Sequence, residues 1–167
     1  GLPGTGKTEF ARHLAEKLGR ELMAKTASDL LSMWLGQTEQ NIADMFDAAS
    51  DRADEVVLLL DEADTFLMDR SQAKASWERS QTNEFLARME SFPGIFVCTT
   101  NLFDRLDPAV LRRFQFRLEF QGLLLPQACR LFASAFGRPP NVEESSKLQQ
   151  LAGRVVPADF ANVARQL

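Results

Sequence analysis

The sequence has no tyrosine, a single histidine and only two cysteines among its 167 residues. The cysteines, Cys98 and Cys129, are too far apart for a paired-cysteine metal motif and lie in apolar segments, which predicts free, buried thiols. The histidine, His13, lies among charged residues and is predicted to be solvated, without an acid–base task. No apolar run approaches membrane-spanning length and no secretory signal opens the chain, so a cytoplasmic protein without a membrane span is expected.

An excess of positive charge is also missing, because the formal net charge is −4 at pH 7. Surfaces that bind nucleic acid usually carry a basic excess, so nucleic acid is not indicated as a partner and proteins are favoured. Hydrophobic residues make up 45% of the chain, which is enough to form a core. Thirteen phenylalanines predict a phenylalanine-rich core, which is a matter of packing and not of function.

The spacing of apolar residues predicts an alternation of helices and strands in the first three quarters of the chain. Helices are predicted over residues 6–18, 38–50 and 80–90. Strands are predicted over residues 21–25, 56–60, 95–100 and 114–120. Continuous apolar runs such as 56–60 are typical of parallel strands that are covered on both faces. We therefore expect a three-layer α/β fold with a parallel sheet.

From residue 122 onward the strands end and three further helices are predicted, over residues 127–136, 142–151 and 158–167. Asn141 is a suitable N-cap for the middle helix. These patterns predict an α/β nucleotide-binding subdomain in residues 1–121 and a small helical lid in residues 122–167. A first strand upstream of Gly1 and a truncated lid are also expected, because the chain starts inside a loop that normally follows a strand.

The first eight residues, Gly-Leu-Pro-Gly-Thr-Gly-Lys-Thr, match the phosphate-loop (Walker A) pattern GxxxxGK[ST] in full. Its glycines allow backbone N–H groups to turn toward a phosphate at the N-terminus of the following helix. The ammonium group of Lys7 would neutralise phosphate oxygens, and the hydroxyl of Thr8 would bind Mg²⁺. The pattern predicts a P-loop site for ATP and Mg²⁺. The predicted nucleotide-binding residues of this segment are Pro3, Gly4, Thr5, Gly6, Lys7, Thr8 and Glu9.

Two acidic residues, Asp61 and Glu62, follow the apolar strand at residues 56–60, as in a Walker B motif. Open α/β sheets bind ligands at the carboxyl ends of their strands. Asp61 is predicted to hold Mg²⁺, usually through water, and Glu62 to orient and polarise the attacking water. A pair of acids that merely caps a helix is the alternative.

Residues 61–64, Asp-Glu-Ala-Asp, also spell the tetrapeptide that names a helicase family. Those helicases carry a Ser-Ala-Thr motif after the next strand and a second α/β domain, and this chain has neither. The helicase interpretation therefore fails, and Asp64 is predicted to form a local salt bridge or cap. Asn101, at the end of the next strand, is predicted to hydrogen-bond the γ-phosphate or the attacking water.

Together with these motifs, residues 106–114, Leu-Asp-Pro-Ala-Val-Leu-Arg-Arg-Phe, resemble the AAA ATPases. This segment is similar to the second region of homology that separates the family from other P-loop NTPases. The resemblance covers nearly the whole chain and implies ATP hydrolysis in a homo-oligomeric ring, most often a hexamer. It also implies that Arg112 and Arg113 act as arginine fingers on the γ-phosphate bound by the neighbouring subunit. A solvated arginine pair at a helix end is the alternative.

Details of the resemblance point to particular branches of the family. The adjacent arginines resemble those of microtubule-severing and ESCRT-disassembling members, whereas many relatives have Pro-Gly between them. Gln115 stands where relatives often have aspartate. Residues 157–160 resemble the Gly-Ala-Asp turn of the lid, and residues 76–86 look most like poorly characterised bacterial AAA proteins.

Trp34-Leu35-Gly36 resembles the first pore loop of AAA rings that thread polypeptides. The resemblance implies that Trp34 and Leu35 contact a protein substrate in the central pore, whereas the alternative places Trp34 in the core. Two functions therefore stay open. One is a motor that remodels or threads proteins, and the other is a nucleotide-dependent switch or loader that assembles on another macromolecule without threading.

Overall fold

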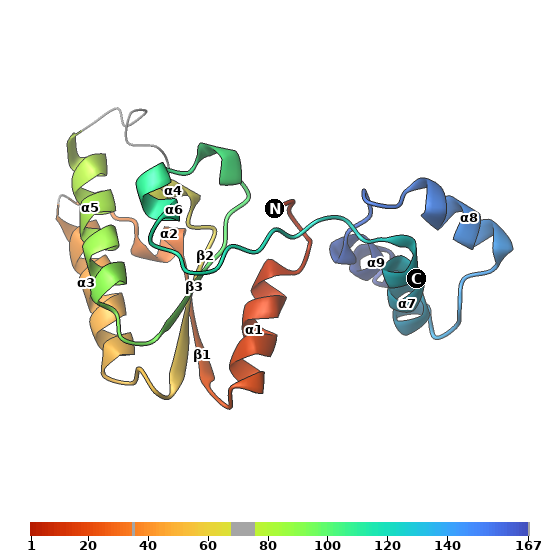
Figure 1. The fold of residues 1–167 in the computed structure, drawn as a ribbon, viewed down its shortest axis with the longest axis horizontal. Coiled ribbons are helices and arrows are strands. Elements are labelled where there is room, and N and C mark those ends of the chain that lie inside the picture. The colour runs from red at the N-terminus through yellow and green to blue at the C-terminus, as the bar shows by residue number, and fades with distance from the viewer. Residues whose placement is uncertain (35, 68–75, 167) are drawn as a thin grey trace. The chain divides into compact units, whose positions relative to one another are not determined.

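A computed structural model describes residues 1–34, 36–67 and 76–166 of the chain (Figure 1). The chain divides into two compact units, one formed by Thr8–Arg117 and the other by Gly1–Lys7 together with Leu118–Leu167. Residues 1–7 and 118–121 thus group with the C-terminal helices, whereas the sequence pattern assigned them to the α/β subdomain. The assignment of residues 1–121 and 122–167 as functional subdomains stays a prediction.

A three-stranded parallel sheet forms the centre of the larger unit, in the order β1-β2-β3. Its strands are β1 (Glu21–Thr26), β2 (Val56–Asp61) and β3 (Ile95–Cys98). Thr26 is in register with Asp61, and Leu60 is in register with Cys98. The carboxyl ends of the three strands therefore lie at one edge of the sheet, as the sequence predicted for its site residues.

The strand predicted over residues 114–120 is wrong, because that segment has no regular secondary structure. Its alternation of apolar and polar residues is real, but a strand also needs a neighbouring strand to bond with. None of the strand pairings in the described part of the chain includes this segment. Phe116 and Leu118 are accordingly 83% and 64% exposed.

Helices cover both faces of the sheet in the larger unit (Figure 1). Their bounds are α1 (Lys7–Lys17), α2 (Ala27–Leu30), α3 (Gln37–Ser50), α4 (Asp64–Leu67), α5 (Ser76–Ser91), the 3₁₀ turn η2 (Phe103–Arg105) and α6 (Pro108–Leu111). In Figure 1, α1 lies on one side of the sheet and the paired helices α3 and α5 lie on the other. This arrangement confirms the predicted α/β class with a parallel sheet and flanking helices.

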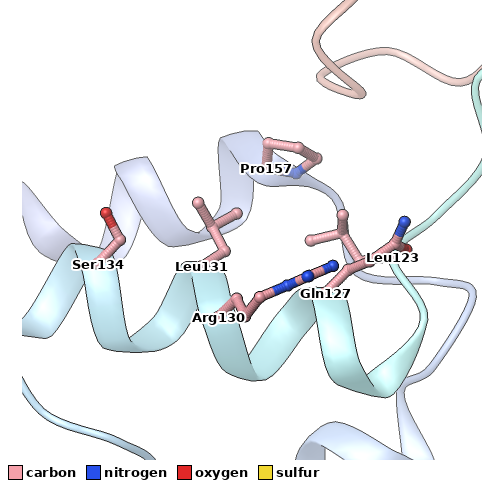
Figure 2. A pocket seen from close by; sticks show the side chains of 6 residues that line it. All are labelled: Leu123, Gln127, Arg130, Leu131, Ser134 and Pro157. Atoms are coloured by element: carbon pink, nitrogen blue, oxygen red, sulfur yellow. The ribbon is translucent and has the colours of Figure 1, made fainter.

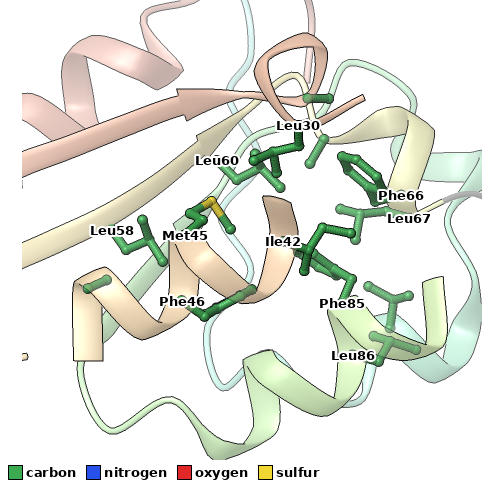
Figure 3. Packing of buried hydrophobic residues seen from close by; sticks show 14 of the residues in the cluster. Leu30, Ile42, Met45, Phe46, Leu58, Leu60, Phe66, Leu67, Phe85 and Leu86 are labelled. Carbon is green, nitrogen blue, oxygen red and sulfur yellow. The ribbon is translucent and has the colours of Figure 1, made fainter. Parts of the chain in front are cut away.

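The core lies between β2 and the α3–α5 pair (Figure 3). Alternate residues of a strand point to opposite faces, and Val56, Leu58 and Leu60 all belong to this cluster. The Phe46 ring is in edge contact with the Phe85 ring, with centroids 5.8 Å apart. The predicted phenylalanine-rich core is confirmed, and it anchors the strand that ends at Asp61.

The smaller unit contains α7 (Leu125–Phe136), α8 (Val142–Gln150) and α9 (Pro157–Ala164). Asn141 caps α8 as predicted, since its Oδ1 accepts the Glu144 N–H at 2.8 Å and Glu144 Oε2 accepts the Asn141 N–H at 2.7 Å. Hydrogen bonds from Arg138, followed by the Asn141 N–H, lower the pKa of Glu144 to about 2. Within the described residues, no helix combines the length and the apolar character needed to cross a membrane.

Candidate active site

The phosphate loop precedes α1 as a tight turn. Gly4 and Gly6 have φ values of 72° and 90°, in the left-handed region that glycine enters without steric cost. Gly4 is constrained a second time, because a Cβ atom there would lie 2.7 Å from the Cβ of Ala158. The buried hydroxyl of Thr5 donates to the carbonyl oxygen of Leu2 at 2.7 Å and closes the turn internally. The turn is therefore held in one conformation by its own glycines and by the Thr5 hydrogen bond.

The side chain of Lys7, the first residue of α1, reaches back across this loop. Its ammonium group donates to the carbonyl oxygens of Gly1 at 3.1 Å and Leu2 at 2.8 Å. A cation held over the glycine turn suits the oxygens of a bound phosphate. In the next part of the helix, Glu9 Oε2 forms an exposed ion pair with Arg12 Nε at 3.4 Å. The contacts predicted for Pro3 and Glu9 with a nucleotide stay predictions.

Thr8 and Asp61 are 53 positions apart in the sequence and meet at the end of β2. Thr8 Oγ1 donates a hydrogen bond to Asp61 Oδ2 at 2.7 Å. Two oxygens at neighbouring corners of a Mg²⁺ octahedron, each about 2.0–2.1 Å from the metal, lie about 2.9 Å apart. The hydroxyl and the carboxylate therefore fit Mg²⁺ both as hard oxygen donors and in their separation. These two residues would hold the ion, directly or through water.

Glu62 turns the chain sharply after β2. Its φ is 54°, and in the described part of the chain Glu62 is the only residue other than glycine with a positive φ. A non-glycine residue in this region costs on the order of 1–3 kcal/mol and persists only where its surroundings hold it, which is common at active sites. The Glu62 N–H donates to Asp61 Oδ1 at 3.2 Å and to Thr99 Oγ1 at 3.1 Å. The Glu62 side chain is exposed, as a residue that activates water requires.

Three polar residues, Thr99, Thr100 and Asn101, follow β3. The Thr99 hydroxyl donates to Asp61 Oδ1, and the Thr100 hydroxyl donates to Asp64 Oδ1. Asp64 therefore accepts a hydrogen bond from a threonine hydroxyl, whereas the sequence predicted a local salt bridge or a cap. Asn101, the third of these residues, is half-buried, and its contact with a phosphate or a water stays a prediction. Sequence reasoning missed Thr99, although a hydroxyl directly after a buried strand was the available signal.

Cys98 and Cys129 are free thiols, as predicted, but both are half-buried and not fully buried as the sequence predicted. Burial, followed by the negative charges of Asp64 and Asp61, raises the pKa of the Cys98 thiol. The thiol therefore stays protonated at neutral pH and packs as a small apolar group, without the reactivity of a thiolate.

The two predicted arginine fingers have different surroundings. They follow α6, whose buried N-cap residue Asp107 accepts the Ala109 N–H at 2.7 Å. Arg113 is ion-paired with Glu90 and donates to the carbonyl oxygen of Ala109 at 2.8 Å. Arg112 is exposed, and within the described part of the chain its guanidinium makes no hydrogen bond or ion pair. Arg112 is therefore better placed to contact another molecule, while the action of both arginines in trans stays a prediction.

Trp34 lies at the protein surface. It is 74% exposed and the preceding Met33 is 91% exposed. The base of the loop is held by polar contacts, since the Ser32 N–H donates to Thr38 Oγ1 at 3.0 Å and the Trp34 N–H donates to Ser32 Oγ at 3.2 Å. The alternative that placed Trp34 in the core is wrong. Leu35 lies outside the described residues, and its contact with substrate stays a prediction.

A shallow hollow of about 360 Å³ lies on the helical unit, along one side of α7 (Figure 2). Figure 2 shows its lining side chains on α7, at the start of α9 and in the segment before α7. None of the predicted site residues belongs to this lining. The lining residues are Leu123, Gln127, Arg130, Leu131, Ser134 and Pro157.

Comparison with known proteins decides the family. Residues 1–122 match the ATPase family associated with various cellular activities (AAA). The chain belongs to this family. The resemblance drawn from the phosphate loop, the strand-end acids and the arginine segment is thereby confirmed.

Several AAA relatives are similar over most of the chain. Vacuolar protein sorting-associated protein 4 of Dictyostelium discoideum is 31% identical over 91% of this chain and 35% of its own length. ATP-dependent zinc metalloprotease FtsH 3 of Sphaerobacter thermophilus is 33% identical over the whole chain and 35% of its own length. A spastin homolog of Caenorhabditis elegans is 33% identical over 71% of the chain. The chain thus spans about a third of the length of the first two relatives.

The crystal structure of the FIGL-1 AAA domain in complex with ADP has the same fold. It superposes with a TM-score of 0.77 and 23% identity, covering 99% of this chain and 57% of that one. The AAA fold of a parallel sheet with flanking helices is therefore shared at low sequence identity.

Proposed function

We propose that this AAA chain binds ATP with Mg²⁺ and hydrolyses it within a cytoplasmic homo-oligomeric ring, a hexamer, that acts on protein substrates. The observation that carries the proposal is the contact of Thr8 with Asp61, with Glu62 turned outward at the same strand end. Phosphate loops that only bind an anion have no need of a carboxylate pair opposite the loop hydroxyl.

Each residue has a distinct part in this proposal. Lys7 neutralises the β- and γ-phosphate oxygens, and the hydroxyl of Thr8 and the carboxylate of Asp61 hold Mg²⁺. When bound, Mg²⁺ supplies positive charge that offsets the charge developing on the phosphate oxygens. Glu62 polarises and orients the attacking water, and Asn101 hydrogen-bonds that water or the γ-phosphate.

Phosphate release by the intact protein tests the hydrolysis directly. We expect ATP turnover that requires Mg²⁺ and stops when EDTA removes it. Lys7→Ala is expected to weaken ATP binding at least about tenfold, because the loop loses the cation that faces the phosphates. Lys17→Ala, at the exposed end of the same helix, is the matched control and should bind like the parent. Binding of a fluorescent ATP analogue gives the affinities, and equal affinity for the two lysine variants would contradict the assignment.

The protein substrate is proposed from the exposed apolar loop and the family relationship. Met33 and Trp34 project from a loop that carries no charged residue between Leu31 and Gln37. An indole offers large contact area at modest entropic cost and tolerates many substrate sequences. A nucleotide-dependent switch or loader that does not thread polypeptide has no use for this exposed pair, so we favour the threading motor.

Trp34→Ala tests whether the loop grips polypeptide. Casein, an unstructured protein, serves as the substrate probe. We expect casein-stimulated ATP turnover to fall at least about tenfold, while basal turnover and melting temperature stay within error, because an exposed side chain contributes little to folding. Val142→Ala is the control, since Val142 is 90% exposed on the helical unit. A variant that keeps full casein stimulation would shift the function to the switch or loader.

A further inference from the structure

We infer that Thr99 is a positioning residue that sets the directions of both active-site carboxylates, Asp61 and Glu62. The inference deepens the proposed function and rests on it. Thr99 is 5% exposed and directly follows β3, next to the carboxyl end of β2. It is a polar residue in a buried position, which requires that its hydroxyl be bonded.

The hydroxyl of Thr99 is shared between the two acidic residues. Its single proton goes to Asp61 Oδ1, and its oxygen accepts the Glu62 N–H at 3.1 Å. The other carboxylate oxygen, Asp61 Oδ2, accepts the Thr8 hydroxyl at 2.7 Å. Thr99 therefore occupies one oxygen of Asp61 and leaves the other directed at Thr8, the second residue that would hold Mg²⁺. The rotation of the Asp61 carboxylate is limited from both sides.

The backbone of Thr99 holds the same turn. The Thr99 N–H donates to Leu60 O at 3.0 Å, and the Ala63 N–H donates to Thr99 O at 3.0 Å. These bonds fix the backbone before Glu62, at Leu60, and after it, at Ala63. Together with the bond to the Thr99 hydroxyl, they keep the φ of Glu62 at 54°. A residue with positive φ persists only when its neighbours hold it, and Thr99 supplies the bonds on either side of it. The direction in which the Glu62 side chain leaves the strand consequently depends on Thr99.

Thr99→Val removes the hydroxyl and keeps the shape, so it separates bonding from packing. Residues that orient metal ligands typically contribute about 10–100-fold to metal affinity or activity. We expect the valine variant to lose about 10–100-fold in kcat with little change in KM for ATP. We also expect its ADP complex to bind Mn²⁺, a paramagnetic substitute for Mg²⁺, about tenfold more weakly by electron paramagnetic resonance. Thr99→Ser, which restores the hydroxyl, should recover both quantities to within about threefold.

Thr82→Val is the matched control, because Thr82 is 6% exposed on α5 and lies outside this site. It should leave kcat and Mn²⁺ affinity near those of the parent, whatever it does to the melting temperature. The inference is overturned if Thr99→Val keeps parental kcat and Mn²⁺ affinity. It is equally overturned if Thr99→Ser fails as badly as Thr99→Val, since packing and not the hydroxyl would then matter. A parent protein that binds Mn²⁺–ADP without hydrolysing ATP would contradict the proposed function alone, because the Mn²⁺ measurement still tests Thr99.

Discussion

Replacing Glu62 with glutamine is expected to reduce ATP turnover by roughly 10²–10⁴-fold, the range that a general base contributes. The amide cannot polarise water as a carboxylate does, but it has nearly the same size and forms the same backbone bonds. Glutamine should therefore retain the turn at φ 54° and the N–H contacts to Asp61 and Thr99. Affinity for ATP is expected to stay within about twofold of the parent, so the variant should trap bound nucleotide.

Single-turnover phosphate release and binding of a fluorescent ATP analogue measure the two quantities separately. Glu16→Gln, at an exposed position of α1, removes a carboxylate of the same kind away from the strand end and should behave like the parent. Turnover by Glu62→Gln at the parental rate would show that another group activates the water. Loss of nucleotide affinity in step with turnover would instead place Glu62 in binding and not in the chemical step.

Arg112→Ala is expected to lower ATP turnover by roughly 10³-fold, since an arginine finger offsets charge in the transition state. Arg113→Ala should lose less, because its guanidinium is already bonded to Glu90 and to the carbonyl oxygen of Ala109. That substitution removes contacts within the subunit, so its main effect should be on stability. Turnover and melting temperature of the two single variants give the comparison. A larger loss of turnover in Arg113→Ala would reverse the assignment of the two arginines.

Mixed assemblies test whether Arg112 acts on the neighbouring subunit. Subunits with Arg112→Ala keep an intact phosphate loop, whereas subunits with Lys7→Ala keep an intact arginine. If the finger works in trans, mixing the two inactive proteins should restore part of the parental turnover, because some interfaces pair a functional loop with a functional arginine. The control is the unmixed Arg112→Ala protein at the same total concentration. If Arg112→Ala alone hydrolysed ATP at the parental rate at every protein concentration, the proposal that Arg112 acts in trans would be wrong.

The phosphate loop and the strand-end acids could be predicted because their signals are local. Gly4, Gly6 and Lys7 belong to one short segment whose spacing is dictated by the size of a phosphate and by the start of a helix. Asp61 and Glu62 follow an apolar run that only a strand covered on both faces explains. Parallel strands then bring their carboxyl ends to one edge, which is why Asp61 and Thr8 meet across 53 positions.

Long-range pairing decided what the local pattern could not. Residues 114–120 have the alternation of a half-buried strand, yet they form no strand, because alternation alone does not create the ladder of backbone hydrogen bonds that defines one. The same holds for Thr99, whose sequence context marks it as a strand-end residue like Thr100. Only the register of β3 against β2 determines that one hydroxyl bonds to Asp61 and the other to Asp64.

The sequence by itself therefore determined the AAA family and the α/β framework, and it predicted the chemistry of a phosphate loop, a carboxylate pair and an arginine pair, because each depends on residue type and short spacing. Only the tertiary structure decided that Trp34 is exposed and not part of the core. It also decided that the Arg113 guanidinium is bonded within its subunit, whereas that of Arg112 makes no hydrogen bond or ion pair with the described residues. The physical reason is the same in each case. The exposure of a side chain and its bonding partners depend on which distant segments fold against it. The sequence of one segment alone does not identify those segments.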